Sequence, residues 1–134
     1  MSNADHTAHP SEEPDYNRLL RSNLEHVFNE RDAGKRDAAI AELFVAEPIM
    51  YEPTTIVRGR AAISEVAGTL LERFGPAFRF QPEGDAVGHH GLGSLSWKAG
   101  PADGPVAVMG SDVADIADGR IARLWVLLDP EKAQ

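Results

Sequence analysis

The chain has 134 residues, a length that suits one compact domain with its own hydrophobic core. Its net charge of −8, without a cluster of Lys or Arg, disfavours nucleic acid and anionic membrane surfaces as partners. Because cysteine is absent, disulfides, thiolate metal sites and cysteine nucleophiles are excluded. No apolar run approaches the roughly 18 residues of a membrane-spanning helix. The first residues also lack the pattern of a secretory signal, and we expect a cytoplasmic protein.

The composition changes after the first 14 residues. Residues 1–14 contain two prolines and mostly polar or small side chains, which predicts a disordered tail. Regular apolar patterns begin at Asp15 and continue almost to the end of the chain. The sequence therefore predicts a tail at 1–14 and a single domain at 15–130.

Three helices are predicted in the first half of the domain. Apolar residues recur at helical spacing over residues 20–28. A second, short helix is expected to begin with a cap at Asp37 and to end at Pro48. The third helix has the clearest pattern, over residues 63–74, and Gly75 followed by a proline ends it.

The remaining segments alternate in the manner of strands. Short strands are predicted at residues 49–52 and 78–80, a longer one at 85–99, and another from near Pro105. Asp118 and the glycine after it indicate a hairpin that leads into the last strand. Helices followed by a series of strands predict an α+β domain, with the helices covering one face of an antiparallel sheet.

One acidic residue interrupts the apolar face of the strand that follows Pro105. Asp112 alternates with five small or apolar residues, Val106, Val108, Gly110, Ala114 and Ile116. Burying a carboxylate is costly unless it is paired or protonated. Asp112 is therefore either an acid with a raised pKa that donates to a ligand oxygen, or a structural residue bonded to backbone amides or to an arginine such as Arg58 or Arg60.

Other candidates also allow two interpretations. Glu52, at the end of a predicted strand, is either a general base at a pocket mouth or a solvent-facing residue. Tyr51 and Trp97 are either pocket-lining aromatics or ordinary core residues. His89 and His90 are adjacent, so only one of them can point inward from a strand, and the pair indicates no metal site.

Strand alternation places a second set of residues on the opposite face of the sheet. Trp125 lies opposite the apolar register of the last strand, and Met109 and Val113 lie opposite the register of Asp112. Exposed aromatic and aliphatic side chains of this kind are typical of an interface. We therefore expect a homodimer formed through Met109, Val113 and Trp125.

The order of elements, and three segments within it, carry a family resemblance. The segments are AELFVAEPIMYEP, VRGRAAISEV and GSDVADIADGRIARLWVLLD. With them the chain resembles the NTF2-like superfamily, and in particular its SnoaL-like members, related to polyketide cyclases and ketosteroid isomerases. This resemblance implies an α+β cone, in which N-terminal helices pack on a curved antiparallel sheet that encloses an apolar pocket. It also implies dimerisation through the outer face of the sheet.

The isomerases provide the most informative comparison. The resemblance implies a general-base carboxylate before a proline at the end of the first strand, where this chain has Glu52, and a protonated acid on a later strand, where it has Asp112. The tyrosine of the first helix is missing, and the corresponding turn carries His26, Val27 and Phe28. The epoxide-hydrolase pattern is not met, since Val126 and Gly110 occupy the positions of its carboxylate and arginine.

Three hypotheses follow. The first is a SnoaL-like enzyme that carries out cofactor-free proton transfer, of the isomerase or cyclase type, on a small hydrophobic oxygen-bearing molecule. Glu52 and Asp112 would be catalytic, and no metal or cofactor is expected. The second is a non-catalytic domain that binds a hydrophobic ligand or a protein, and the third is a structural dimer with a sealed core. The residues expected to line the pocket are His26, Phe28, Tyr51, His89, His90 and Trp97.

Overall fold

The computed structural model describes residues 13–130, so the predicted tail at 1–14 lies almost wholly outside the described residues. The helices are α1 (Tyr16–Ser22), the π-helix η2 (Asn23–Phe28), α2 (Ala33–Leu43) and α3 (Arg60–Phe74). The strands are β1 (Phe44–Glu52), β2 (Thr55–Arg58), β3 (Phe78–His89), β4 (Leu92–Pro101), β5 (Val108–Ala117) and β6 (Arg120–Leu128). Within this part of the chain, no helix combines the length and the apolar character needed to cross a membrane.

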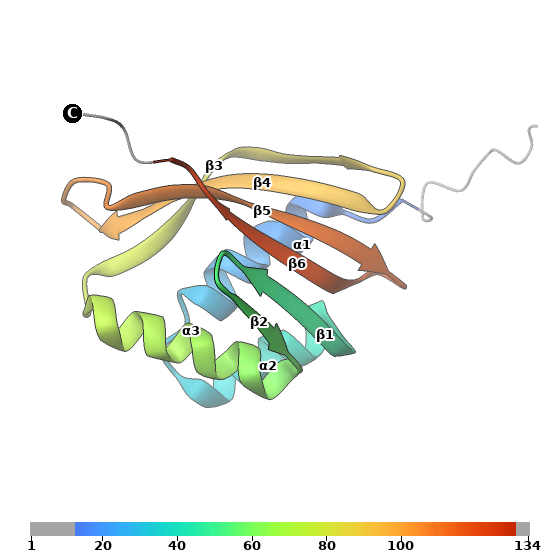
Figure 1. The fold of residues 1–134 in the computed structure, drawn as a ribbon, viewed down its shortest axis with the longest axis horizontal. Coiled ribbons are helices and arrows are strands. Elements are labelled where there is room, and N and C mark those ends of the chain that lie inside the picture. The colour runs from blue at the N-terminus through green and yellow to red at the C-terminus, as the bar shows by residue number, and fades with distance from the viewer. Residues whose placement is uncertain (1–12, 131–134) are drawn as a thin grey trace, which may run out of the picture.

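The six strands form one curved sheet in the order β2-β1-β6-β5-β4-β3, with the helices packed on one of its faces (Figure 1). This arrangement confirms the predicted α+β class. The sheet is mixed rather than purely antiparallel, because β1 pairs with β6 in parallel. A hairpin cannot join two parallel strands, and here the chain passes through β2, α3 and three further strands before β6 returns beside β1.

The helix boundaries differ from the prediction in two places. The side chain of Asp32 accepts a hydrogen bond from the Lys35 amide at 2.9 Å, so α2 begins one turn before the expected cap at Asp37. The same helix ends at Leu43, before the expected stop at Pro48. Pro48 lies inside β1, where a bulge in the pairing with β6 accommodates a residue that lacks an amide hydrogen.

Turns account for the remaining differences. A hairpin joins β1 to β2, a strand that the sequence analysis did not predict. The hairpin between β3 and β4 turns at His90 and Gly91, which have φ angles of 53° and 85°, so the predicted strand over 85–99 is divided between β3 and β4. The hairpin predicted at Asp118 is confirmed, and that residue has a φ angle of 54°.

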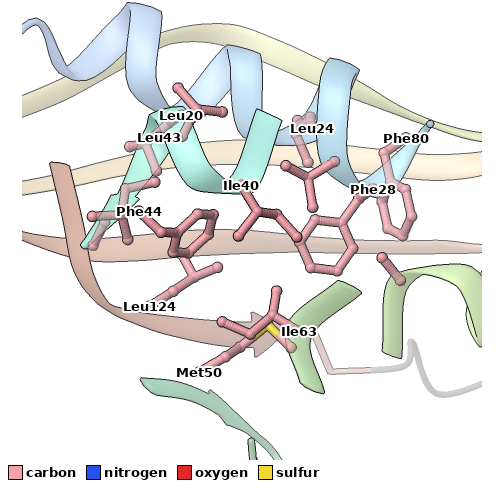
Figure 2. Packing of buried hydrophobic residues seen from close by; sticks show 14 of the residues in the cluster. Leu20, Leu24, Phe28, Ile40, Leu43, Phe44, Met50, Ile63, Phe80 and Leu124 are labelled. Carbon is pink, nitrogen blue, oxygen red and sulfur yellow. The ribbon is translucent and has the colours of Figure 1, made fainter. Parts of the chain in front are cut away.

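The hydrophobic core lies between the helices and the inner face of the sheet (Figure 2). Leu20 and Leu24 project from the first helical segments toward Ile40 of α2 and Leu124 of β6, and all four side chains are almost fully buried. Burying a side chain of this size stabilises the fold by roughly 1.5–3 kcal/mol. Phe28, at the end of η2, meets the ring of Phe80 edge to face, and this pair connects the core to the candidate site.

Candidate functional site

A pocket of about 450 Å³ opens between the helices and the inner face of the sheet. Segments from both ends of the chain line it, including the end of η2, the β1–β2 turn, the last turns of α3 and the inner faces of β3 to β6. Most of the lining is apolar. The residues involved are Leu24, Phe28, Glu52, Pro53, Thr54, Leu70, Phe74, Phe78, Phe80, Trp97, Val108, Asp112, Val126 and Leu128.

One wall of the pocket is a continuous series of aromatic rings. Phe74, which is half exposed at the end of α3, stacks on Phe78 with ring centroids 4.5 Å apart. Phe78 then meets Phe80 edge to face at 5.4 Å, and Phe80 meets Trp97 at 5.3 Å. Stacked and edge-to-face rings present a rigid apolar surface. The series leads from the surface to the buried indole of Trp97.

Trp97 is the last ring of this series, and it contacts Asp112. The indole Nε1–H donates to Asp112 Oδ1 at 3.0 Å, and the Asp112 side chain is only 4% exposed. Burial raises the pKa of Asp112 to about 7, and the hydrogen bond from Trp97 offsets part of that increase. Gly110 leaves space for this contact, since a Cβ atom there would lie 2.8 Å from the Trp97 ring.

The structural alternative for Asp112 was a bond to backbone amides or to an arginine such as Arg58 or Arg60. Among the described residues the hydrogen bond to its carboxyl group comes from the Trp97 indole, not from a backbone amide. Arg60 instead donates to the carbonyl oxygens of Phe44 and Val45, at 2.8 and 2.9 Å. Arg58 is exposed at the end of β2. Asp112 is therefore a buried acid without a cationic partner among the described residues, and this environment favours the protonated form at pH values below about 7.

Asn23 is a residue of the site that sequence analysis missed. Its side chain is fully buried at the start of η2, close enough to the Asp112 carboxyl to lower the pKa of that group. Neither its amide nitrogen nor its amide oxygen completes a hydrogen bond of regular geometry in the described structure. The available signal for Asn23 was a polar residue within the first apolar helix. The regular 3.6-residue period could not show that this residue points inward, because the segment is a π-helix.

Glu52 reaches the same pocket from the end of β1. Its side chain is partly buried, and burial raises its pKa above the ordinary value of a glutamate. The pocket thus brings together the two carboxyl groups that the sequence analysis singled out. Their surroundings differ, because Asp112 lies fully buried beside Trp97 whereas Glu52 remains partly in contact with solvent.

The residues expected to line the pocket fall into two groups. Phe28 and Trp97 do line it. Tyr51 does not, because strand alternation turns it to the outer face, where its ring stacks on Trp125 with a centroid distance of 5.0 Å. His26 also lies outside the pocket, exposed on η2 with Nε2 3.6 Å from a carboxylate oxygen of Glu25.

The two adjacent histidines lie outside the pocket as well. Both His89 and His90 are exposed at the β3–β4 hairpin, with their Nδ1 atoms 2.8 Å apart. The prediction that one of them points inward assumed a continuous strand, whereas the turn begins at this pair and ends the alternation of faces. Among residues 13–130, no group of three or more His, Asp or Glu side chains is arranged to hold a metal ion.

Comparison with solved structures identifies the fold. A candidate isomerase of the SnoaL-like family from Agrobacterium tumefaciens superposes with a TM-score of 0.78 at 23% identity, over 86% of this chain and 97% of that one. A candidate ketosteroid isomerase from Kribbella flavida gives a TM-score of 0.67 at 13% identity, over 89% and 81% of the two chains. The chain has the NTF2-like fold. A candidate polyketide cyclase from Sinorhizobium meliloti gives 0.62 at 17% identity, over 81% and 93%.

The NTF2-like fold accounts for the position of the pocket but leaves its chemistry open. No protein-family model matches the sequence, and no curated protein matches it. A designed protein with a curved sheet gives a TM-score of 0.65, so this architecture does not require any particular activity. The chemistry of the pocket therefore depends on this chain's own polar side chains, namely Glu52, Thr54 and Asp112 in the lining and Asn23 beside Asp112.

Proposed function

We propose that the protein is a SnoaL-like enzyme that transfers a proton, without a cofactor, within a small hydrophobic molecule that carries an oxygen atom. The observation that carries this proposal is the presence of Glu52 and Asp112 in one apolar pocket, both with pKa values raised by burial. Pairs of carboxyl groups in different surroundings commonly divide the roles of base and acid. The isomerase and cyclase names of structural neighbours are consistent with this chemistry.

The proposed step assigns a separate role to each carboxyl group. Glu52 in its ionised form removes a proton from a carbon next to a carbonyl group, and the electron pair of the C–H bond moves toward the carbonyl oxygen. Asp112 in its neutral form donates a hydrogen bond to that oxygen and stabilises its developing negative charge. Where a C=C double bond lies next to the carbon that lost the proton, Glu52 then returns the proton to the far carbon of that double bond, and the double bond moves into conjugation with the carbonyl group. The proton is conserved, and no redox partner is required.

The lining of the pocket supports an uncharged ligand. Glu52 and Asp112 are the only ionisable groups among the lining residues, so no lysine or arginine in that set would pair with an anion. The aromatic series from Phe74 to Trp97 offers flat apolar surfaces to a ring compound. A ring that lies along this wall would bring an oxygen substituent to Asp112.

The first test is isotope exchange. A panel of cyclic ketones is incubated with the protein in D₂O, and deuterium uptake next to the carbonyl group is followed by NMR. We expect uptake with at least one ketone, and a loss of about 10²–10⁴-fold in Glu52→Gln, since general-base catalysis contributes a factor of this size. Asp112→Asn should also be impaired, because an amide is a weaker donor to an oxyanion than a neutral carboxyl group.

Glu47→Gln provides the matched control, because Glu47 is an exposed glutamate of the same strand. It should exchange at the wild-type rate. Equal exchange rates in wild type, Glu52→Gln and Asp112→Asn would contradict the enzymatic proposal.

The alternative function is non-catalytic binding of a hydrophobic ligand. The extended aromatic wall favours it, since such a surface binds apolar molecules whether or not a reaction follows. In a binding protein, Phe80→Ala would weaken the affinity for an uncharged fluorescent probe such as N-phenylnaphthylamine, whereas Glu52→Gln would leave it nearly unchanged. Probe binding without deuterium exchange for any ketone would favour this alternative.

A further inference from the structure

Among the described residues, the Asn23 side chain is a buried polar group beside the site that the proposed reaction does not use. It is fully buried, and among the residues described it is the side chain that leaves both a buried donor and a buried acceptor unpaired. A buried donor without a partner is unfavourable, so natural folds rarely keep one without a reason. Its position at the first residue of a π-helix adds weight, because such irregular turns recur at functional sites.

The neighbour of this amide is Asp112, whose two carboxyl oxygens have different surroundings. Oδ1 accepts the indole N–H of Trp97 at 3.0 Å. No described hydrogen bond of regular geometry reaches Oδ2, although the Asn23 side chain lies beside the carboxyl group. A neutral carboxyl group has little need of a second donor, whereas a carboxylate forms shorter and stronger hydrogen bonds to N–H groups. The unpaired amide is thus suited to the ionised state.

Few other groups compete for this role. On the strands that flank β5, Asp112 lies opposite Leu95 of β4 and Val126 of β6, neither of which titrates. Trp97 is a donor without a charge, and Glu52 is the titratable group that shares the pocket. Asn23 is the polar side chain that reaches Asp112 from the helical layer.

We propose that Asn23 is a positioning residue of the site, whose amide N–H donates to the second oxygen of Asp112 when that carboxyl group gives up its proton. The proton passes to solvent in the pocket, and the carboxylate is then held between Trp97 on one oxygen and Asn23 on the other. Asn23 thereby opposes the effect of burial and keeps Asp112 able to exchange its proton near neutral pH. This role rests on Asp112 being the acid of the proposed function.

The indole of Trp97 provides a direct readout. Because it donates to Asp112, its N–H chemical shift should follow the titration of that carboxyl group. The chain has two tryptophans, and Trp125 on the other face of the sheet serves as an internal reference. In ¹⁵N-labelled wild type we expect a midpoint near the Asp112 pKa of about 7, and Asp112→Asn should abolish the titration.

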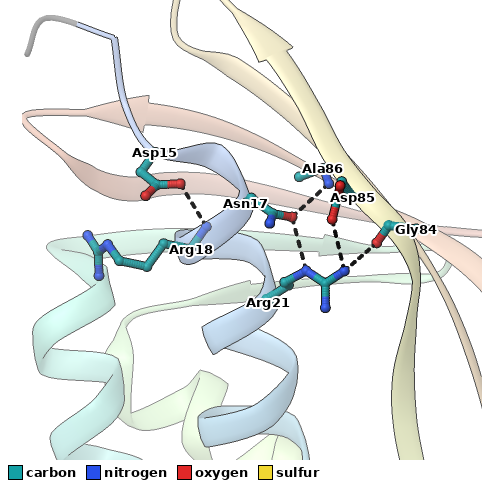
Figure 3. A network of polar contacts seen from close by, with 7 residues as sticks. All are labelled: Asp15, Asn17, Arg18, Arg21, Gly84, Asp85 and Ala86. Atoms are coloured by element: carbon teal, nitrogen blue, oxygen red, sulfur yellow. Dashed lines mark hydrogen bonds and ion pairs between the residues drawn. The ribbon is translucent and has the colours of Figure 1, made fainter. Parts of the chain in front are cut away.

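Removal of the amide should then shift this midpoint. In Asn23→Leu it should rise by about half a unit to one unit, the effect of one lost hydrogen bond on an ionised group. Asn23→Ala is a second variant in case leucine is not accommodated. Asn17→Leu is the matched control, because Asn17 is an asparagine of α1 that bonds to groups other than Asp112. Its Oδ1 accepts from Arg21 Nε and from the Ala86 amide (Figure 3).

The control should lower stability without moving the midpoint. An unchanged or lower midpoint in the folded Asn23 variants would overturn the proposal, as would a Trp97 signal that does not titrate in wild type. None of these measurements uses a ligand. If no ketone exchanges deuterium but the midpoint shifts clearly upward, the proposed enzyme is refuted, while the hydrogen bond from Asn23 to the Asp112 carboxylate is still supported.

Discussion

At the scale of single residues, the proton affinity of Asp112 is set by opposing effects. Burial disfavours the charged form, while the indole of Trp97 and the amide of Asn23 favour it. The result is a carboxyl group with a pKa of about 7, far above that of an aspartate in water. A group of this kind links the chemistry of the site to the stability of the fold.

That linkage predicts how stability changes with pH. Because the folded-state pKa of Asp112 is raised, its stabilising contribution is complete below about pH 4, the pKa of an unfolded aspartate. It is lost as the pH rises through the folded pKa of about 7. Relative to Asp112→Asn, wild type should therefore lose a few kcal/mol of unfolding free energy between about pH 4 and pH 7, at about 1.4 kcal/mol for each pKa unit.

Urea unfolding of both proteins across this pH range would measure the change. The contribution of Glu52, whose raised pKa acts in the same direction, is common to both proteins and cancels in the comparison. A difference between the two unfolding free energies that does not vary with pH would contradict the assignment of Asp112 as a buried acid.

At the scale of elements, one arginine binds the connection between α3 and β3, which carries the aromatic rings of Phe74 and Phe78. The guanidinium of Arg31, just after η2, donates to the carbonyl oxygens of Leu71, Gly75 and Phe78, at 3.1, 2.7 and 3.0 Å. These carbonyls belong to the end of α3 and the start of β3. We therefore infer that Arg31 fixes the position of Phe74 and Phe78 along the pocket.

We predict that Arg31→Met weakens ligand binding more than it weakens the fold. Affinity for N-phenylnaphthylamine should fall about tenfold, or ~1.4 kcal/mol, because the two rings lose their fixed position. Stability should fall by only about 1 kcal/mol, since Arg31 is exposed and its partners are neutral. Fluorescence titration and urea unfolding would measure the two effects. Arg60→Met removes similar bonds to β1 carbonyls, and equal loss of affinity in that control would contradict the prediction.

The elements also show what the sequence could and could not reveal. The apolar alternation around Asp112 predicted its burial, because a strand in a two-layer domain has one inner face. The π-helix was not predictable from the same kind of pattern, so Asn23 was missed. The pocket position expected for His26 came from the comparison with the isomerases and was wrong, because His26 is exposed on η2. Whether His89 and His90 lie on a strand or in a turn depended on the position of the β3–β4 hairpin, which the local sequence did not predict.

At the scale of the whole molecule, the outer face of the sheet carries the residues from which we propose a homodimer. Trp125 is stacked on Tyr51, Arg123 lies over its ring at 5.4 Å, and Met109 is 41% exposed. Val113 lies directly opposite Trp125 in the strand register. These side chains share the outer face of the sheet with the Arg123–Asp115 ion pair, and we propose that a second copy covers them.

We predict that sedimentation equilibrium detects a dimer in wild type and a monomer in Trp125→Lys, because burying an unpaired ammonium at an interface is costly. Val106→Lys changes an exposed valine outside this face, in the loop before β5, and should remain dimeric. A wild-type protein that stays monomeric at high concentration would contradict the homodimer.

The parallel pairing of β1 with β6 also governs the order in which the chain can fold. In the register of this pair Met50 lies opposite Leu124, so β1 gains this partner only after residues 120–128 have been made. Bringing such distant segments together costs loop-closure entropy and slows folding. A nascent chain that ends before Arg120 leaves β1 and β5 with open edges and the pocket without its β6 wall. We therefore expect the pocket to form only after β6 has paired with β1 and β5.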